Sequence, residues 1–154
     1  MFKVHFICQG NVFRSRLAEA YLKSICSAGV KVTSSGVAAN QNTDGPIGWY
    51  AAKIIKKNSL IEFASPNWTQ TSVAILKEQQ LVIFMTQAQL RYVKATLGFL
   101  PKSYQVWEIP DLTDFGYTSD DLSNKNLIAS IKKSDQIFDQ LKIKIAELIK
   151  TSLS

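Results

Sequence analysis

The chain reads Cys8-Gln9-Gly10-Asn11-Val12-Phe13-Arg14-Ser15 at the point where its first predicted strand ends and its first predicted helix begins. Residues 2–7 precede this segment, and their β-branched and aromatic side chains are typical of a strand. After it, apolar side chains recur at helical spacing until Gly29, namely at Ala18, Tyr21, Leu22 and Ile25. The segment is therefore predicted to be a loop that joins a strand to a helix.

Strands and helices alternate along the rest of the chain. Residues 81–85 are apolar throughout, which is typical of a strand buried on both faces of a parallel sheet. The other elements that we expect are strands at 30–33 and 104–107, a helix opened by Pro46, a helix capped by Ser65 before Pro66, a helix begun by a capping box at Thr86–Gln89, a loop at Ile109–Ser119 and a long final amphipathic helix. This order predicts an α/β fold: a doubly wound open sheet of about four parallel strands with helices on both faces, in one domain over residues 1–154.

The composition excludes several classes of protein. With 46% hydrophobic and 19% charged residues, the chain is neither disordered nor a coiled coil. It contains no apolar run of the ~18 residues that a membrane span needs, and Lys3 and His5 interrupt the only candidate for a signal-peptide core. We therefore expect a cytoplasmic protein without membrane insertion. The net charge of +6 suits anionic partners but does not choose among phosphorylated substrates, nucleic acid and membrane surfaces.

Cysteine and histidine are scarce. Two cysteines, Cys8 and Cys26, argue against a disulfide framework. The single histidine, His5, excludes the usual zinc sites, and its place in a predicted strand indicates a structural role. We expect neither a metal nor a cofactor. Cys26 is predicted to belong to the core, because Leu22 and Ile25 occupy the same helix face.

The residue types of the first loop suit a bound phosphate. Successive main-chain N–H groups and the start of the following helix form an anion site. Gly10 permits a left-handed backbone, Asn11 tolerates one and can tie the loop with its amide, and Arg14 offers a planar fork for two phosphate oxygens. A thiol in such a cradle, as at Cys8, ionises readily and becomes a nucleophile. The alternative is that the pattern arose by chance and Cys8 is a buried thiol.

The segment resembles the signature of the low-molecular-weight protein tyrosine phosphatases, Cys-x-Gly-Asn-x-Cys-Arg-Ser-Pro. Three further segments are similar to that family: Ser34–Val37, the strand that ends in Met85, and Glu108–Asp111. The resemblance implies that Cys8 attacks phosphorus and forms a phosphocysteine. It also implies that Arg14 and the loop residues Gln9, Gly10, Asn11, Val12 and Phe13 hold the phosphate oxygens, that Ser15 donates to the Cys8 sulfur, and that Asp111 protonates the leaving group.

The chain departs from the family pattern at three places. Phe13 replaces the second loop cysteine, so we expect no protective disulfide with Cys8. Arg16 replaces the proline and is expected to add positive charge near the mouth of the site. The family's Asp-Pro is Asp111-Leu112 here, and Asp114 is a second candidate for the acid; alignment through Ile-Pro-Asp favours Asp111.

The walls of the pocket are less well defined by the sequence. Phe115 and Tyr117 are the candidate aromatic walls, Asn40 and Gln41 contribute polar side chains, and Trp49 is expected in the helix core. The expected partner is a phosphotyrosine-containing protein or a small phosphomonoester.

Three other functions are possible. The altered acid loop and Phe13 motivate one alternative, a catalytically weak or inactive phosphate- or phosphopeptide-binding module. An arsenate reductase needs two cysteines besides Cys8, and only Cys26 is present. A nucleic-acid binder is supported by the charge alone, so we expect no nucleic-acid partner.

Overall fold

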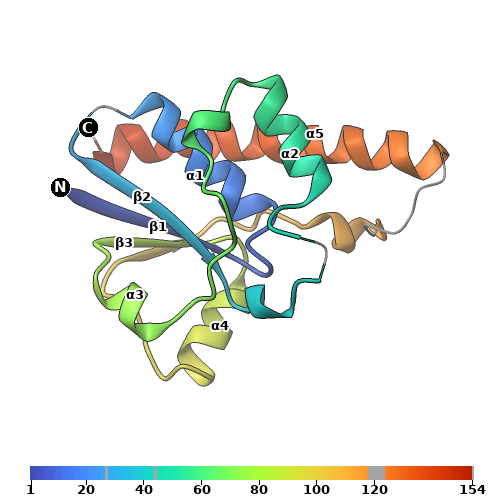
Figure 1. Cartoon of the computed structure of the whole chain (residues 1–154). Helices are drawn as coiled ribbons and strands as arrows, with labels where there is room; N and C mark the ends of the chain where they lie inside the picture. Colours follow the sequence, from blue (N-terminus) through green and yellow to red (C-terminus); the bar gives the residue numbers. More distant parts are fainter. Residues whose placement is uncertain (27, 44, 118–123, 154) are drawn as a thin grey trace.

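Four parallel strands form the central sheet of the protein (Figure 1). In the computed structural model, which describes residues 1–26, 28–43, 45–117 and 124–153, their order is β2-β1-β3-β4 and every neighbouring pair is parallel. The strands are β1 (Phe2–Cys8), β2 (Val30–Gly36), β3 (Leu81–Phe84) and β4 (Tyr104–Val106). The expectation of an open parallel sheet is confirmed.

Helices cover both faces of this sheet (Figure 1). One face carries α1 (Arg14–Ile25), α2 (Trp49–Lys57) and α5 (Asn124–Leu148), and the other carries α3 (Val73–Lys77) and α4 (Gln87–Ala95). The core is accordingly divided into two apolar clusters. The larger one contains Phe6, Leu17 and Leu141, and the smaller one contains Ile7, Phe84 and Val93.

The parallel register brings the candidate loop to one edge of the sheet. Cys8, the last residue of β1, pairs with Gly36, the last residue of β2. Ile7 pairs with Phe84, the last residue of β3. The carboxyl ends of three strands therefore meet where the first loop begins, which is the edge at which open α/β sheets bind ligands.

Two helix starts differ from the sequence-based expectation. Ser65 does not cap a helix: its carbonyl accepts from Arg16 and its hydroxyl donates to Glu19, so contacts with α1 hold this segment as a loop. The helix begins later, at α3, where the Ser72 hydroxyl accepts from Ile75 N at 3.3 Å. Likewise α2 begins at Trp49 rather than at Pro46, whose carbonyl accepts from Arg16.

Other boundaries follow the predicted pattern more closely. The capping box Thr86–Gln89 opens α4 as predicted. The second strand runs on to Gly36, beyond its predicted end, because it pairs with β1 along its whole length. A short 3-10 helix, η3 (Leu112–Phe115), lies in the predicted loop 109–119, whose last two residues fall outside the described residues.

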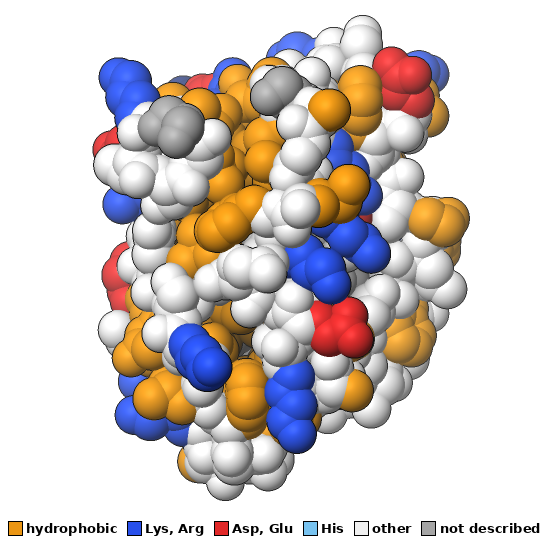
Figure 2. Space-filling model, turned by 90° about the vertical axis from the view of Figure 1, so that its left-hand side faces the viewer, with side chains coloured by type: hydrophobic (Ala, Val, Ile, Leu, Met, Phe, Trp, Pro, Cys, Tyr) orange, Lys and Arg blue, Asp and Glu red, His pale blue; other side chains and the backbone are white. Residues whose placement is uncertain are grey.

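The end of the molecule at which the strands begin is shown in Figure 2. Lys and Arg side chains are dispersed over this face and acidic side chains lie among them. One such pair joins Lys3 to Glu78 at 3.6 Å. Within the part of the chain that the structure describes, no helix is both long and apolar enough to cross a bilayer.

Candidate active site

Cys8 lies at the base of the first loop, where two polar groups contact its sulfur. The residue is buried, and its Sγ lies 2.9 Å from the Ser15 hydroxyl oxygen. Asn11 N–H donates to the same sulfur over 3.2 Å. Both contacts stabilise negative charge on the sulfur when Ser15 donates its proton. This arrangement agrees with the role expected for Ser15.

Asn11 fixes the shape of the loop. Its φ is +54°, and its buried side chain uses all of its polar atoms. Nδ2 donates to Ser15 Oγ at 2.7 Å and to Ser34 Oγ at 2.9 Å, and Oδ1 accepts from Thr69 N at 2.8 Å. The sequence allowed a left-handed backbone at Gly10 or Asn11, and Asn11 is the residue that adopts it, because Asn tolerates this conformation when its amide is hydrogen-bonded locally.

Gly36 allows the loop to pack tightly against the end of β2. A Cβ on Gly36 would lie 2.7 Å from Asn11 N, 2.7 Å from Gln9 O and 2.8 Å from Gly10 C. All three are main-chain atoms of the loop, so a flexible side chain could not give way. The next two residues support the loop as well: Val37 N donates to Cys8 O at 3.1 Å and Ala38 N donates to Gln9 O at 2.8 Å.

Arg14 and Asp111 form an ion pair beside Cys8. The Arg14 side chain is buried, with Nη1 donating to Ile109 O at 2.8 Å and Nη2 lying 3.2 Å from Asp111 Oδ2. Asp111 also caps η3, its Oδ1 accepting from Leu112 N at 2.8 Å. The Asp114 carboxylate instead accepts from Asp111 N at 2.9 Å and does not line the cavity beside Cys8. Of the two candidate acids, the structure brings Asp111 to the loop.

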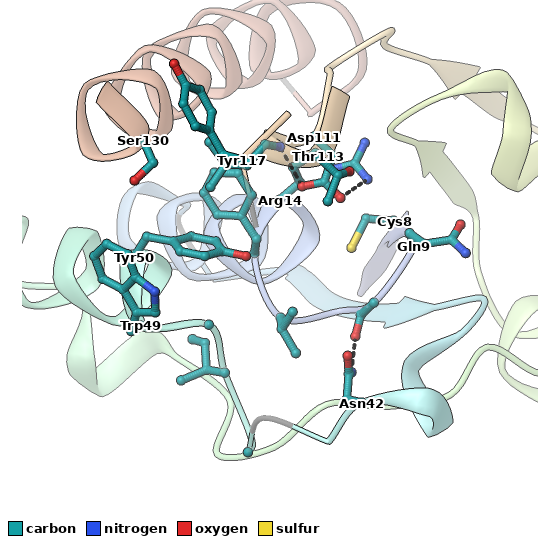
Figure 3. Close-up of a pocket in the computed structure, with 17 residues that line it drawn as sticks. Cys8, Gln9, Arg14, Asn42, Trp49, Tyr50, Asp111, Thr113, Tyr117 and Ser130 are labelled. Carbon is teal, nitrogen blue, oxygen red and sulfur yellow. Dashed lines mark hydrogen bonds and ion pairs between the residues drawn. The ribbon is translucent and has the colours of Figure 1, made fainter. Parts of the chain in front are cut away.

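A cavity of about 370 Å³ opens over the loop (Figure 3). The predicted site residues that line it are Cys8, Gln9, Gly10, Val12, Phe13, Arg14 and Asp111. The two others, Asn11 and Ser15, are buried; each contacts the Cys8 sulfur, and Asn11 Nδ2 also donates to Ser15 Oγ.

The walls of this cavity differ in part from the expectation. Tyr117 lines it as predicted. Phe115 does not, and Lys133 Nζ lies over its ring at 4.3 Å from the ring centroid. Asn40 and Gln41 do not line it; polar side chains come instead from Thr113, Ser130 and Asn42, whose Nδ2 donates to Gly10 O at 2.6 Å. The placement of Trp49 in the helix core is wrong: it lines the cavity and is 37% exposed, because α2 begins at this residue and its first turn faces the loop.

Arg16 is buried rather than exposed at the mouth, which corrects the expected positive charge there. Its Nη1 donates to Asn11 O at 3.1 Å and to Pro46 O at 2.8 Å, and its Nη2 donates to Ser65 O. Burial lowers the pKa of the guanidinium, and the charge of Glu19 opposes that shift. Arg16 therefore ties the loop to two segments distant in sequence.

His5 and Cys26 do not line the cavity either. His5 is buried in β1 between the Thr33 and Ser35 hydroxyls, each 2.7 Å away. Cys26 is a free thiol that packs against the larger apolar cluster, and burial raises its pKa. Among the described residues, no three His, Cys, Asp or Glu side chains lie together as a metal site requires.

Comparison with solved structures identifies the same fold in other proteins. A low molecular weight protein tyrosine phosphatase from Bacillus subtilis matches with a TM-score of 0.71 and 20% identity, covering 99% of this chain and 100% of that chain. An enzyme of the same description from Streptococcus pyogenes matches with 0.70 and 20%, covering 96% and 93%. The YwlE arginine phosphatase from Geobacillus stearothermophilus matches with 0.65 and 19%, covering 98% and 97%. No curated protein sequence matched the chain.

A family model provides the assignment that these structural similarities alone do not give. The model is described as "Low molecular weight phosphotyrosine protein phosphatase" and matches residues 3–150. It thus spans the loop at Cys8, the segment at Asp111 and the whole of α5. The chain belongs to the low molecular weight phosphotyrosine protein phosphatases, which hydrolyse phosphate esters.

Proposed function

We propose that the protein hydrolyses phosphotyrosine, in a protein or as a small aryl phosphate, through a phosphocysteine intermediate. One observation carries the proposal: the Cys8 sulfur accepts from Asn11 N–H at 3.2 Å and lies 2.9 Å from Ser15 Oγ, in a cavity that Arg14 and Asp111 also line. A nucleophile, an anion-binding fork and a proton donor share one cavity. The family membership supports a phosphatase, and this geometry supports the mechanism.

In the first step, the Cys8 thiolate attacks phosphorus and the bond from phosphorus to the leaving oxygen breaks. Asp111, in its protonated form, gives its proton to that oxygen. Arg14 and the main-chain N–H groups of Gln9–Phe13 bind the phosphoryl oxygens, which stabilises the charge that they carry in the transition state. The products of the step are the free alcohol or phenol, the phosphocysteine and the Asp111 carboxylate.

In the second step, water attacks the phosphocysteine and Asp111 takes a proton from that water. The sulfur leaves as a thiolate, and the hydroxyl of Ser15 and the N–H of Asn11 stabilise it. Inorganic phosphate is released and Asp111 is protonated again. The cycle consumes one water molecule and needs no metal ion.

The ion pair between Arg14 and Asp111 must open during this cycle. With 3.2 Å between Arg14 Nη2 and Asp111 Oδ2, the guanidinium is partly engaged by the carboxylate before substrate arrives. A phosphate dianion presents two oxygens to the same fork and competes for it. Binding of the phosphate to Arg14 releases the Asp111 carboxyl group from the ion pair and leaves it available to the leaving oxygen.

The nature of the walls supports an aryl substrate. Phe13, Trp49, Tyr50 and Tyr117 all line the cavity that contains Cys8. Aromatic side chains bury flat rings well and gain specific ring contacts in doing so. This observation favours phosphotyrosine over phosphorylated alkyl alcohols.

Hydrolysis of para-nitrophenyl phosphate by the wild type and by Cys8→Ser tests the proposal, with a chelator and fresh reductant present. We expect activity in the wild type that the chelator does not reduce. Cys8→Ser should lose turnover altogether and still bind inorganic phosphate, because the loop amides and Arg14 remain.

Three results would contradict parts of the proposal. Activity retained in Cys8→Ser would reject the phosphocysteine. A wild type that binds vanadate but does not turn over would favour the phosphate-binding module. Release of phosphate from phosphoarginine but not from phosphotyrosine would reject the substrate assignment while keeping the nucleophile.

A further inference from the structure

The main-chain carbonyls of the first loop are held from outside by hydrogen bonds. Five successive carbonyls, from Cys8 to Val12, each accept from a donor that lies outside the segment 8–15. The donors are, in order along the loop, Val37 N, Ala38 N, Asn42 Nδ2, Arg16 Nη1 and Gly48 N. The shape of the loop therefore depends on two side chains as well as on main-chain groups.

A carbonyl that is held on one side of the loop turns the next N–H group to the other side. In a trans peptide unit the C=O and N–H bonds point in opposite directions, and the described chain contains no cis peptide. The unit between Gly10 and Asn11 shows the effect: its oxygen accepts from Asn42, and its N–H donates to Cys8 Sγ at 3.2 Å. The outer hydrogen bonds thus direct N–H groups of the loop towards the side of the sulfur.

The next peptide unit joins Asn11 to Val12, and Arg16 holds its oxygen. Arg16 Nη1 lies 3.1 Å from Asn11 O, and within the part of the chain that the structure describes Val12 N–H donates to no group. Val12 lines the cavity over Cys8, whereas Arg16 does not. We propose that Arg16 is a positioning residue of the phosphate site: by holding the Asn11 carbonyl, it turns the Val12 N–H group towards the phosphoryl oxygens of the substrate.

The guanidinium of Arg16 is itself held by two further carbonyls. The residue is 2% exposed, its Nη1 also donates to Pro46 O at 2.8 Å, and its Nη2 donates to Ser65 O. These two carbonyls belong to segments that reach the loop from distant parts of the chain. A planar group with donors in fixed directions cannot move with one carbonyl without leaving the others. Arg16 is therefore a rigid support for Asn11 O.

The charge of Arg16 acts in the same direction as its hydrogen bonds. Burial lowers the pKa of the guanidinium, and the charges of Glu19 and Cys8 oppose that shift. The interaction is mutual, so the guanidinium attracts the negative charge of the Cys8 thiolate. Arg16 stands where the family signature has proline, which offers neither a side-chain donor nor a charge. The support of Asn11 O by Arg16 is thus a feature of this chain that the signature does not supply.

The inference rests on the proposed function, and nuclear magnetic resonance tests it one amide at a time. Inorganic phosphate is titrated into the isotope-labelled wild type, Arg16→Met, Leu22→Ala and Arg91→Met, and the shift of each amide proton is followed. Methionine keeps the apolar length of the arginine side chain and removes its donors and its charge. Leu22→Ala opens a cavity in the core on the same helix, so it lowers stability without touching the loop. Arg91→Met removes an exposed guanidinium on α4.

In the wild type, we expect phosphate to shift the Val12 amide proton downfield, because that proton gains a hydrogen bond to an anion. In Arg16→Met this shift should largely disappear. The Gln9 and Gly10 amides should keep their shifts, because main-chain donors still hold the carbonyls that precede them. The dissociation constant of phosphate should rise roughly 10- to 100-fold, the size of one hydrogen bond to a charged group. The two control variants should keep the Val12 shift and the phosphate affinity of the wild type.

Three outcomes would overturn the inference. The first, which needs no variant, is a wild type in which phosphate shifts the Gln9 and Gly10 amides but not that of Val12. The second is an Arg16→Met protein with the Val12 shift or the phosphate affinity of the wild type. The third is an equal loss of affinity in Leu22→Ala, which would show that Arg16 acts through stability alone. Failure of the proposed function looks different: the wild type would bind no phosphate, or would bind it without hydrolysing para-nitrophenyl phosphate.

Discussion

The carboxyl group of Asp111 faces the cavity, while its near neighbour Asp114 is engaged with the main chain. Asp111 Oδ2 lies 3.2 Å from Arg14, and Asp114 Oδ2 accepts from Asp111 N at 2.9 Å. Asparagine caps a helix about as well as aspartate does, so Asp111→Asn keeps the local fold and removes the proposed proton donor. The substitution therefore isolates general-acid catalysis from structure.

We expect Asp111→Asn to lower kcat/KM, which reports the step that releases the leaving group, by ~10²–10⁴ for a poor leaving group such as phenol. The loss should be much smaller for para-nitrophenol, which departs without help from an acid. The measurement is a series of aryl phosphates of graded leaving-group pKa, in which the slope of log kcat/KM against that pKa should steepen in the variant.

Asp114→Asn serves as the matched control for this prediction. It removes a carboxylate from the same short helix and keeps a side chain that can accept from Asp111 N. A steeper slope in Asp114→Asn, with a normal slope in Asp111→Asn, would exchange the two assignments.

At the scale of the element, the end of β2 determines how closely the phosphate-binding loop can pack. A Cβ on Gly36 would lie 2.7–2.8 Å from three main-chain atoms of that loop. Gly36→Ala must therefore displace the loop or the strand. We expect phosphate affinity and kcat/KM to fall at least tenfold, together with a loss of about 1–3 kcal/mol in the free energy of unfolding from overpacking. Calorimetry with phosphate and urea denaturation measure the two effects.

Gly29→Ala separates these two effects. Gly29 has a φ of +113° and open space around its Cα, so alanine there strains the backbone without touching the loop. This variant should lose stability and keep the phosphate affinity of the wild type. Equal phosphate affinity in Gly36→Ala and the wild type would show that the loop does not need the close approach.

Helices and strands whose pattern lies within a few neighbouring residues could be predicted from the sequence. The apolar run 81–85 became the buried strand β3, and the capping box at Thr86 opened α4, because each pattern acts through residues that are neighbours in the chain. Ser65 also has a local capping signal, but a contact from Arg16 overrides it. The Arg16 guanidinium donates hydrogen bonds to the carbonyls of Pro46 and Ser65. Neither hydrogen bond can be recognised from the sequence around its acceptor.

The candidate site divides in the same way. The loop residues from Cys8 to Ser15 are contiguous, so their spacing alone indicates a phosphate cradle. Trp49 and Tyr50, which form one wall, lie at the start of α2, far from the loop in the sequence. Hydrophobic periodicity does not show which side chains of a helix's first turn are buried. Gly36 gives a weak signal only, because glycine also ends strands at ordinary turns, where no loop packs against it.

At the scale of the whole molecule, β1 of the parallel sheet carries two buried polar groups, one at its end and one in its middle. Its carboxyl end contains the candidate nucleophile, and its middle contains His5, which is 1% exposed. The imidazole nitrogens contact Thr33 and Ser35 hydroxyls on β2, and Ser35 contacts Thr71 Oγ1 at 2.7 Å. This polar cluster joins β1, β2 and the segment before α3, and the described hydrogen-bond partners of the imidazole are hydroxyl groups rather than carboxylates.

Burial lowers the pKa of His5 from 6.5 to about 3, so the folded protein keeps the ring neutral where the unfolded chain binds a proton. The contribution of the neutral His5 ring to the free energy of unfolding is complete above pH 6.5. It is lost as the pH falls towards 3, at about 1.4 kcal/mol per pH unit. Between pH 7 and pH 5, we expect the free energy of unfolding of the wild type to fall by about 2 kcal/mol. His5 is the only histidine in the sequence, so urea denaturation of His5→Gln should show a nearly flat profile over this range, whatever stability it loses at pH 7. Parallel profiles for the two proteins would contradict the assignment of the acid sensitivity to His5.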